Sequence, residues 1–129
     1  RHTDNALKVA KFLEQHKKVR YVSYAGLKKN KYYKLSKKYF PNGPGAIFTI
    51  RLKNGYNSCV SLVESVNLFS HVANVGDTRS LIIHPASTTH SQLSNEEKIK
   101  AGAGPDVIRL SIGIENVEDI IEDLDSSIK

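Results

Sequence analysis

The chain has 129 residues, a length that predicts one domain, and 40% of them are hydrophobic, which suffices for a single core. No apolar run approaches the roughly 20 residues of a membrane span, and the only cysteine, Cys59, excludes an internal disulfide. We therefore expect a protein without a membrane segment that works in a reducing cytoplasm. The net charge of +6 is uneven, since residues 1–53 carry 14 basic and 2 acidic side chains, whereas residues 54–129 carry 5 and 11.

The start of the chain is unusual. It begins Arg1-His2, without an initiator methionine, and the whole sequence contains no methionine. Such a start suggests a fragment or a processed product, and a beginning inside a helix would fit a domain cut from a longer protein. We therefore expect residues 1–129 to be one domain of a longer protein.

The first half of the chain predicts three helices and two strands. A helical stripe that Thr3 or Asp4 can cap comprises Ala6, Val9, Ala10 and Leu13. Residues 19–24 are rich in β-formers, and the apolar positions between residues 32 and 39 indicate a short helix. Residues 46–53 alternate as a half-buried strand does, and helical spacing then returns at Cys59, Leu62, Val63 and Val66.

The second half adds strands around a polar turn, Asn74–Asp77. Residues 68–73 and 80–83 are short apolar segments on either side of this turn, and residues 107–112 form a further predicted strand. Strands and helices thus alternate, and one strand face alternates with polar residues. We predict a two-layer α/β (α+β) domain, with a mainly antiparallel sheet of four to five strands and helices packed on one face. The pattern by itself does not exclude parallel pairing.

Two capped helices complete the second half. Ser94 and Glu97 have the form of a capping box that starts a short helix ending near Ala101. Asn116 caps a last helix, whose apolar face contains Val117, Ile120, Ile121 and Leu124. This last helix is also acidic, and it could offset part of the basic first half if the two pack together.

Arg109 is the residue most suggestive of a ligand site, because it lies inside an apolar strand. Burying a guanidinium there is costly unless it meets an anion. Its planar fork can grip a carboxylate with two parallel hydrogen bonds. We therefore predict a site for a small carboxylate, with a purely structural ion pair to Asp77 or Glu115 as the alternative.

Other polar groups suggest less. His84 and His90 have a poor spacing for a metal, with no clustered carboxylate or thiol, so we predict no metal site and expect both to serve local hydrogen bonding. Residues 87–89 show no readable base for a nucleophile, and Cys59 falls on an apolar helix face as a core residue does. The basic half invites a nucleic-acid partner, but lysines on exposed helix faces explain it better, so none is predicted.

Several motifs together resemble the carboxy-terminal domain of the cysteine/methionine-metabolism family of pyridoxal-phosphate enzymes, within the fold-type I transferases. The resemblance is carried by Asn74–Asp77, Ser80–His90, Ile108–Glu115 and Val117–Ile121. It extends over nearly the whole chain and looks closest to the O-acetylhomoserine sulfhydrylase branch.

The resemblance implies a divided active site. The family holds pyridoxal phosphate on a lysine of a larger preceding domain, which is absent here, so no catalytic and no cofactor-binding residue is expected in this chain. Lys37 is the nearest look-alike, and we reject it because a short basic helix offers no desolvated site. By the same resemblance Arg109 binds the substrate carboxylate, Asn74 assists it from the turn, and Thr89 lies near the same pocket.

The implied activity is synthesis of homocysteine from O-acetylhomoserine and sulfide, in methionine biosynthesis. The acetyl group leaves from the γ carbon and hydrosulfide takes its place. The alternatives are a cystathionine γ-synthase or γ-lyase, against which Asn74 in place of serine argues, and a basic nucleic-acid-binding module. The resemblance also implies a homotetramer for the complete enzyme, whereas the isolated piece is expected to be inactive and monomeric or dimeric.

Overall fold

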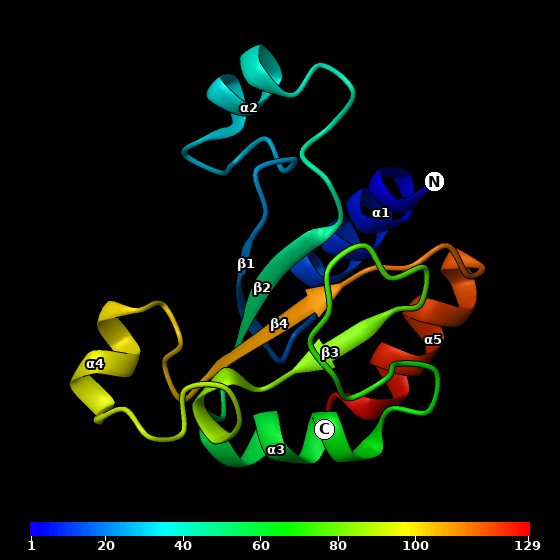
Figure 1. Ribbon diagram of the computed structural model, residues 1–129. Coiled ribbons are helices and arrows are strands. Elements are labelled where there is room, and N and C mark those ends of the chain that lie inside the picture. Colours follow the sequence, from blue (N-terminus) through cyan, green and yellow to red (C-terminus); the bar gives the residue numbers. More distant parts are fainter.

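A computed structural model describes residues 1–129 as two layers, a sheet and a layer of helices (Figure 1). The four strands stand in the order β1-β2-β4-β3, and every neighbouring pair is antiparallel. Their bounds are Val19–Ser23 for β1, Ile47–Leu52 for β2, Leu81–Ile83 for β3 and Val107–Ser111 for β4. The predicted fold class, an antiparallel sheet covered by helices on one face, is confirmed.

Three helices provide the helical layer: α1 (His2–Gln15), α3 (Tyr56–Ser65) and α5 (Val117–Ser127). Their apolar stripes and the inward side chains of the sheet form one core of 23 buried residues. Cys59 of α3 belongs to this core, as its place on the apolar face predicted. None of the helices combines the length and the apolar character that a membrane span requires.

The remaining helical segments lie outside the two layers (Figure 1). They are α2 (Tyr33–Tyr39), the 3-10 turn η1 (Pro85–Ser87) and α4 (Asn95–Lys100). The capping box expected at the start of α4 is present: the Ser94 hydroxyl accepts from the Glu97 N–H, and the Glu97 carboxylate accepts from the Ser94 N–H. The Asn116 amide oxygen likewise accepts from the Glu118 N–H at the start of α5.

The two faces of the sheet are covered differently. On β2, Phe48, Ile50 and Leu52 point into the helical core, as the alternation predicted. On β3, Ile82 joins that core, whereas Leu81 and Ile83 are buried outside it. The segment before β3 covers them from the opposite side, since residues 72–74 line a cleft together with all three β3 residues. This loop, rather than a helix, therefore shields the second face.

Two predictions about local structure are wrong. Helix α1 begins at His2 with Arg1 as its N-cap residue and has no side-chain cap, because Thr3 and Asp4 already lie in its first turn. Residues 68–73 are not a strand, and only Ser70 forms an isolated parallel bridge, to Leu81. The reason is a competing acceptor on α5.

That acceptor is the Asp123 carboxylate, which is buried. It accepts hydrogen bonds from the backbone N–H groups of Asn67, Leu68 and Phe69 at 2.8, 3.0 and 3.4 Å. Backbone donors held by a side chain are no longer available to a strand ladder. Asp123 therefore turns a segment with strand composition into a loop fixed on α5.

Replacing Asp123 by Ala should lower the unfolding free energy by roughly 2 kcal/mol or more, because three N–H groups lose their acceptor in a part-buried place. Urea unfolding of the 129-residue chain measures this. Asp119→Ala is the matched control, since Asp119 is an exposed carboxylate of the same helix. Equal stability of the two variants would show that Asp123 does not hold the loop.

Candidate carboxylate-binding site

Arg109 lies in the middle of the sheet. It belongs to β4, opposite Thr49 of β2 on one side and Ile83 of β3 on the other. Its side chain is half-buried on the face away from the main helical core. The guanidinium forms no ion pair and no hydrogen bond with the protein. No buried side-chain nitrogen lacks a partner, so its nitrogens must reach solvent.

Arg109 and Asn74 line the same cleft. Its other walls are mainly apolar and come from the loop before β3, from β3 and from β4: Val72, Ala73, Leu81, Ile82, Ile83 and Ser111. The cleft has a volume of about 10 Å³, close to that of a single water molecule. Apolar walls strengthen the attraction between a guanidinium and an anion. The space, however, admits only the end of a larger ligand.

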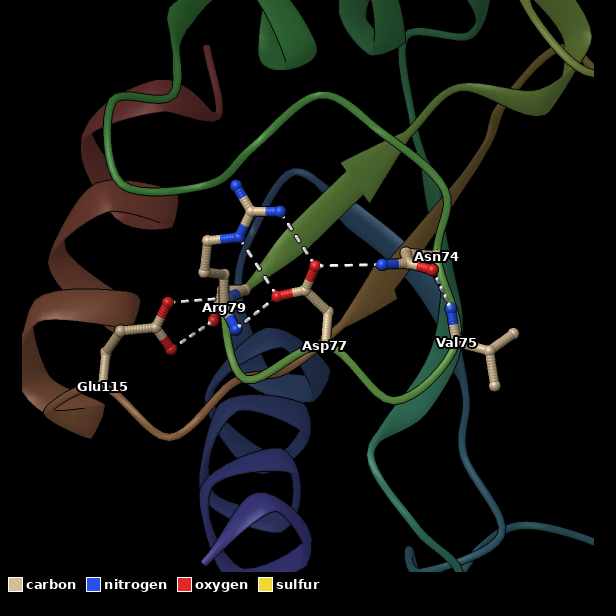
Figure 2. A network of polar contacts seen from close by, with 6 residues as sticks. Asn74, Val75, Asp77, Arg79 and Glu115 are labelled. Carbon is tan, nitrogen blue, oxygen red and sulfur yellow. Dashed lines mark hydrogen bonds and ion pairs between the residues drawn. The ribbon is translucent and has the colours of Figure 1, made fainter.

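Asn74 opens a tightly bonded turn, shown in Figure 2. Its amide oxygen accepts from the Val75 N–H at 2.8 Å, and its amide nitrogen donates to Asp77 at 3.2 Å. Gly76 adopts a φ of 75°, which closes the turn and which side chains rarely tolerate. The backbone N–H of Asn74 donates to no group of the protein. The Asn74 backbone N–H and the Arg109 guanidinium are therefore two unpaired donors, and their residues line the same cleft.

The acids that could have neutralised Arg109 are engaged elsewhere. Asp77 forms a fork with Arg79, whose Nε and Nη2 donate to its two carboxylate oxygens at 3.1 and 2.9 Å. Glu115 accepts from the Ser80 N–H at 2.6 Å and from its hydroxyl at 2.9 Å. Neither of the two internal partners proposed from the sequence therefore pairs with Arg109.

Gly113 lets the ends of β3 and β4 approach each other. Its N–H donates to the Ser80 hydroxyl at 2.9 Å, next to the Glu115 carboxylate. A methyl group at Gly113 would lie 2.5 Å from the Ser80 nitrogen and even closer to the Thr78 carbonyl oxygen and the Glu115 carboxylate. Only glycine fits here, which accounts for the glycine that follows the arginine strand.

Helix α1 fixes the same corner from the other side. The buried Asn5 amide donates to the carbonyl oxygens of Gly113 and Glu115 at 3.1 and 2.9 Å. The His2 imidazole lies 2.7 Å from the Ile112 carbonyl oxygen. These two residues gave no signal in the sequence, because their partners lie more than 100 residues away.

Thr89 is not among the residues that line the cleft. It is exposed in the turn after η1, and its hydroxyl pairs with the ring of its neighbour His90 at 2.8 Å. His90 thus serves local hydrogen bonding, as predicted. The structure brings Arg109 and Asn74 together but leaves Thr89 apart from them.

His84 is fully buried at the end of β3. Its Nε2 donates to the Pro105 carbonyl oxygen at 2.9 Å, so Nδ1 is the acceptor that faces the Ser87 hydroxyl, also at 2.9 Å. Burial lowers the pKa of His84, and the positive charge of Lys98 adds to this, while the Pro105 carbonyl acts in the opposite direction. His84 is therefore a neutral link between η1 and the loop before β4. No group of three His, Cys, Asp or Glu residues is arranged to hold a metal ion.

No lysine of the chain occupies a site that would suit a covalently held cofactor. All are exposed except Lys98, which is half-buried on α4. Lys37, the rejected look-alike, is exposed on α2, and its ammonium lies over the Tyr33 ring. Burial raises the pKa of the Cys59 thiol to about 12, so it offers no nucleophile either.

Comparisons with known proteins point to one family. The family model described as "Cys/Met metabolism PLP-dependent enzyme" matches residues 1–129. An O-acetyl-L-homoserine sulfhydrylase of Leptospira meyeri is 48% identical over 130 aligned positions, which cover 100% of this chain and 29% of that protein. A homocysteine synthase of Schizosaccharomyces pombe is 48% identical over 95% of this chain and 29% of its own length.

A solved structure gives the same result. A crystal structure from Campylobacter jejuni subsp. jejuni, described as an O-acetylhomoserine (thiol)-lyase with N'-pyridoxyl-lysine-5'-monophosphate, superposes with a TM-score of 0.91. It is 47% identical and is matched over 98% of this chain and 30% of that chain. The present chain thus spans about 30% of the length of these relatives.

Gly113→Ala should lower the unfolding free energy by about 2 kcal/mol, because the added methyl group forces backbone to move at the corner of β3 and β4. Thermal or urea unfolding of the chain measures it. Gly104→Ala is the control, since its methyl group would find the nearest atom, on Asp106, at an ordinary 3.4 Å. A loss of the same size in both variants would contradict the role assigned to the close approach.

The chain should lose stability as the pH falls below about 6.5, the pKa of histidine in an unfolded chain. Because the folded pKa of His84 is lowered, the unfolded state binds the proton first, so the contribution is present above that pH and is lost towards the folded pKa. Urea unfolding at pH 7.5 and 5.5 measures the loss. It should be smaller in His84→Gln than in His90→Gln, and equal losses would contradict the prediction.

Proposed function

The chain belongs to the Cys/Met metabolism PLP-dependent enzyme family, and we propose that it is the carboxy-terminal, substrate-carboxylate-binding domain of an O-acetylhomoserine sulfhydrylase. The complete enzyme would make homocysteine from O-acetylhomoserine and sulfide. Relatives at 48% identity that carry the sulfhydrylase and homocysteine synthase names support this activity. Enzymes of this family act on amino acids, which carry the carboxylate that the site would bind.

The observation that carries the proposal is the unpaired guanidinium of Arg109 in a cleft shared with Asn74. The charge has no counter-ion in the protein, and the two partners considered from the sequence, Asp77 and Glu115, are engaged with Arg79 and Ser80. A site that keeps a cation unpaired between apolar walls is prepared for an anionic group. An amino-acid carboxylate fits the fork of donors.

The residues of this chain do not fit pyridoxal phosphate, the cofactor named in the family description. The lysines are almost all exposed, whereas a lysine that carries the cofactor covalently needs a desolvated site that lowers its pKa. We infer that the part of the enzyme outside residues 1–129 holds the cofactor. The isolated chain is then inactive, and its task is to bind and orient the substrate.

The contribution of Arg109 to the reaction is geometric. Two parallel hydrogen bonds to a carboxylate fix both the position and the rotation of the substrate. The bond to be broken is thereby held at a constant angle to the reacting group on the other part of the enzyme. Asn74 would add its free backbone N–H to the same carboxylate, and Thr89 is proposed as a neighbour that approaches when the site is complete.

The proposal extends to the compartment and the assembly of the complete enzyme. We place it in the cytoplasm, since the single thiol is buried and unpaired. For the complete enzyme we propose a homotetramer, with this chain as one domain of each subunit. Family membership favours the enzyme over the nucleic-acid-binding module that the basic half suggested.

A cystathionine γ-synthase or γ-lyase is the nearest competitor, because the carboxylate clamp would serve it equally. Product formation by the complete enzyme from O-acetylhomoserine with either sulfide or cysteine distinguishes the two. Homocysteine formation that prefers sulfide supports the sulfhydrylase, whereas a preference for cysteine would replace it with the synthase.

Arg109→Lys in the complete enzyme should raise the KM for O-acetylhomoserine roughly 10- to 100-fold, since a point charge cannot replace two parallel hydrogen bonds to a charged group. Steady-state kinetics with the amino acid varied measures it, and the KM for sulfide should stay constant. Arg51→Lys is the matched control, because Arg51 lies on the neighbouring strand outside the cleft. An unchanged KM in Arg109→Lys would remove the assigned role.

A further inference from the structure

The turn next to Arg109 carries a carboxylate that cannot itself bind an anionic substrate. The Asp77 carboxylate accepts a hydrogen bond at 3.2 Å from the Asn74 amide. Asn74 lines the cleft, whereas Asp77 does not, so Asp77 lies directly behind a residue of the cleft wall. A free negative charge at that place would repel a carboxylate ligand. Its presence beside the proposed site therefore needs an explanation.

Arg79 supplies the explanation. Its backbone N–H, Nε and Nη2 all donate to the Asp77 carboxylate, at 2.9, 3.1 and 2.9 Å, as Figure 2 shows. With the Asn74 amide as a fourth donor, both oxygens of Asp77 are occupied and its charge is compensated. The pKa of the Asp77 carboxyl is well below its usual range, chiefly because of the hydrogen bonds from Arg79, so the pair stays ionised.

The same contacts fix Asn74. Its side chain is held between the Val75 N–H and the Asp77 carboxylate, across a turn that depends on the positive φ of Gly76. Residues 74–76 and Arg79 are exposed, whereas the Asp77 side chain is only 10% exposed. Removing the Asp77–Arg79 fork would leave Asn74 free to move while the rest of the fold remains in place.

We propose that the Asp77–Arg79 ion pair is the positioning device of the substrate clamp. It holds Asn74 in register with Arg109 and cancels the negative charge that the turn would otherwise present to the substrate carboxylate. Both residues act through Asn74 and the local field, without touching the substrate. This inference rests on the proposed function of the cleft.

The test uses the complete enzyme and compares Asp77→Asn and Arg79→Gln with Asp119→Asn, an exposed carboxylate of α5. Asp77→Asn should raise the KM for O-acetylhomoserine about tenfold with kcat within about twofold, since a displaced clamp weakens ground-state and transition-state binding alike. The melting temperature should change by only about 2 °C, because the Arg79 side chain of the pair is exposed, although the Asp77 side chain is only 10% exposed. The control should match the wild type.

Arg79→Gln keeps Asp77 in the turn and tests the charge separately. Salt weakens attraction between Arg109 and the substrate, so the KM of the wild type should rise with ionic strength. In Arg79→Gln the same salt also screens the uncompensated Asp77 charge, so the KM should start higher and rise less steeply. In the double variant Arg109→Lys with Asp77→Asn, the increase should be smaller than the product of the single effects.

The outcomes separate this inference from the function on which it rests. An increased KM in Arg109→Lys with an unchanged KM in Asp77→Asn and Arg79→Gln would overturn the positioning role and leave the clamp intact. A loss of kcat and melting temperature in Asp77→Asn without a change in KM would mean a structural role only, and would overturn it too. An unchanged KM in Arg109→Lys would remove both.

Discussion

The proposed binding site depends on one unpaired charge, the guanidinium of Arg109. Arg109 lies at the centre of a four-stranded sheet, between β2 and β3, where burial of an apolar side chain would cost less free energy than burial of a charge. A protein that only needed to fold could have placed an acid opposite it, and the sequence offers Asp77 and Glu115 as candidates. Both are instead bonded to other groups, Asp77 to Arg79 and Glu115 to Ser80. The Arg109 guanidinium therefore stays unpaired because Arg79 and Ser80 occupy the two acids.

That network uses carboxylates to hold backbone in place. Asp123 gathers three N–H groups of the loop after α3, Glu115 binds the first residue before β3, and Asp77 binds the Arg79 N–H. Strand β3 has only three residues, and so short a strand contributes few ladder bonds. The carboxylates compensate for this by fixing the segments on both sides of the strand. The wall of the cleft thereby gains rigidity without a covering helix.

Periodicity and local chemistry were enough to predict most of the fold. The helical stripes, the alternating strand at residues 46–53 and the two polar caps at Ser94 and Asn116 are local signals, and the structure contains all of them. The strand predicted at residues 68–73 failed because its N–H groups bind a carboxylate 55 residues later. Asn5 was missed for the same reason. Contacts between residues so far apart along the chain cannot be recognised from a single sequence.

The site itself was predictable only in part. An arginine inside an apolar strand is unusual and can be recognised from the sequence alone. In the structure, the turn residue Asn74 lines the same cleft as this arginine. What could not be predicted is that the internal counter-ions Asp77 and Glu115 are occupied, since this depends on the side-chain geometry of Arg79 and Ser80. Thr89 does not line the cleft in this chain, and its exposed hydroxyl pairs with His90. Its place near the substrate therefore stays a prediction.

The small size of the cleft implies that the proposed carboxylate site needs a second wall from outside residues 1–129. At about 10 Å³ it cannot enclose an amino acid, so in this chain the guanidinium faces water. In water a pair of unit charges 4 Å apart attract each other by only about 1 kcal/mol, whereas the same pair near a protein surface of lower dielectric gains about 4 kcal/mol. A second wall that expels water would therefore strengthen the grip severalfold without a new contact from Arg109. For the proposed function, a carboxylate would be held firmly only where such a second wall excludes water from Arg109.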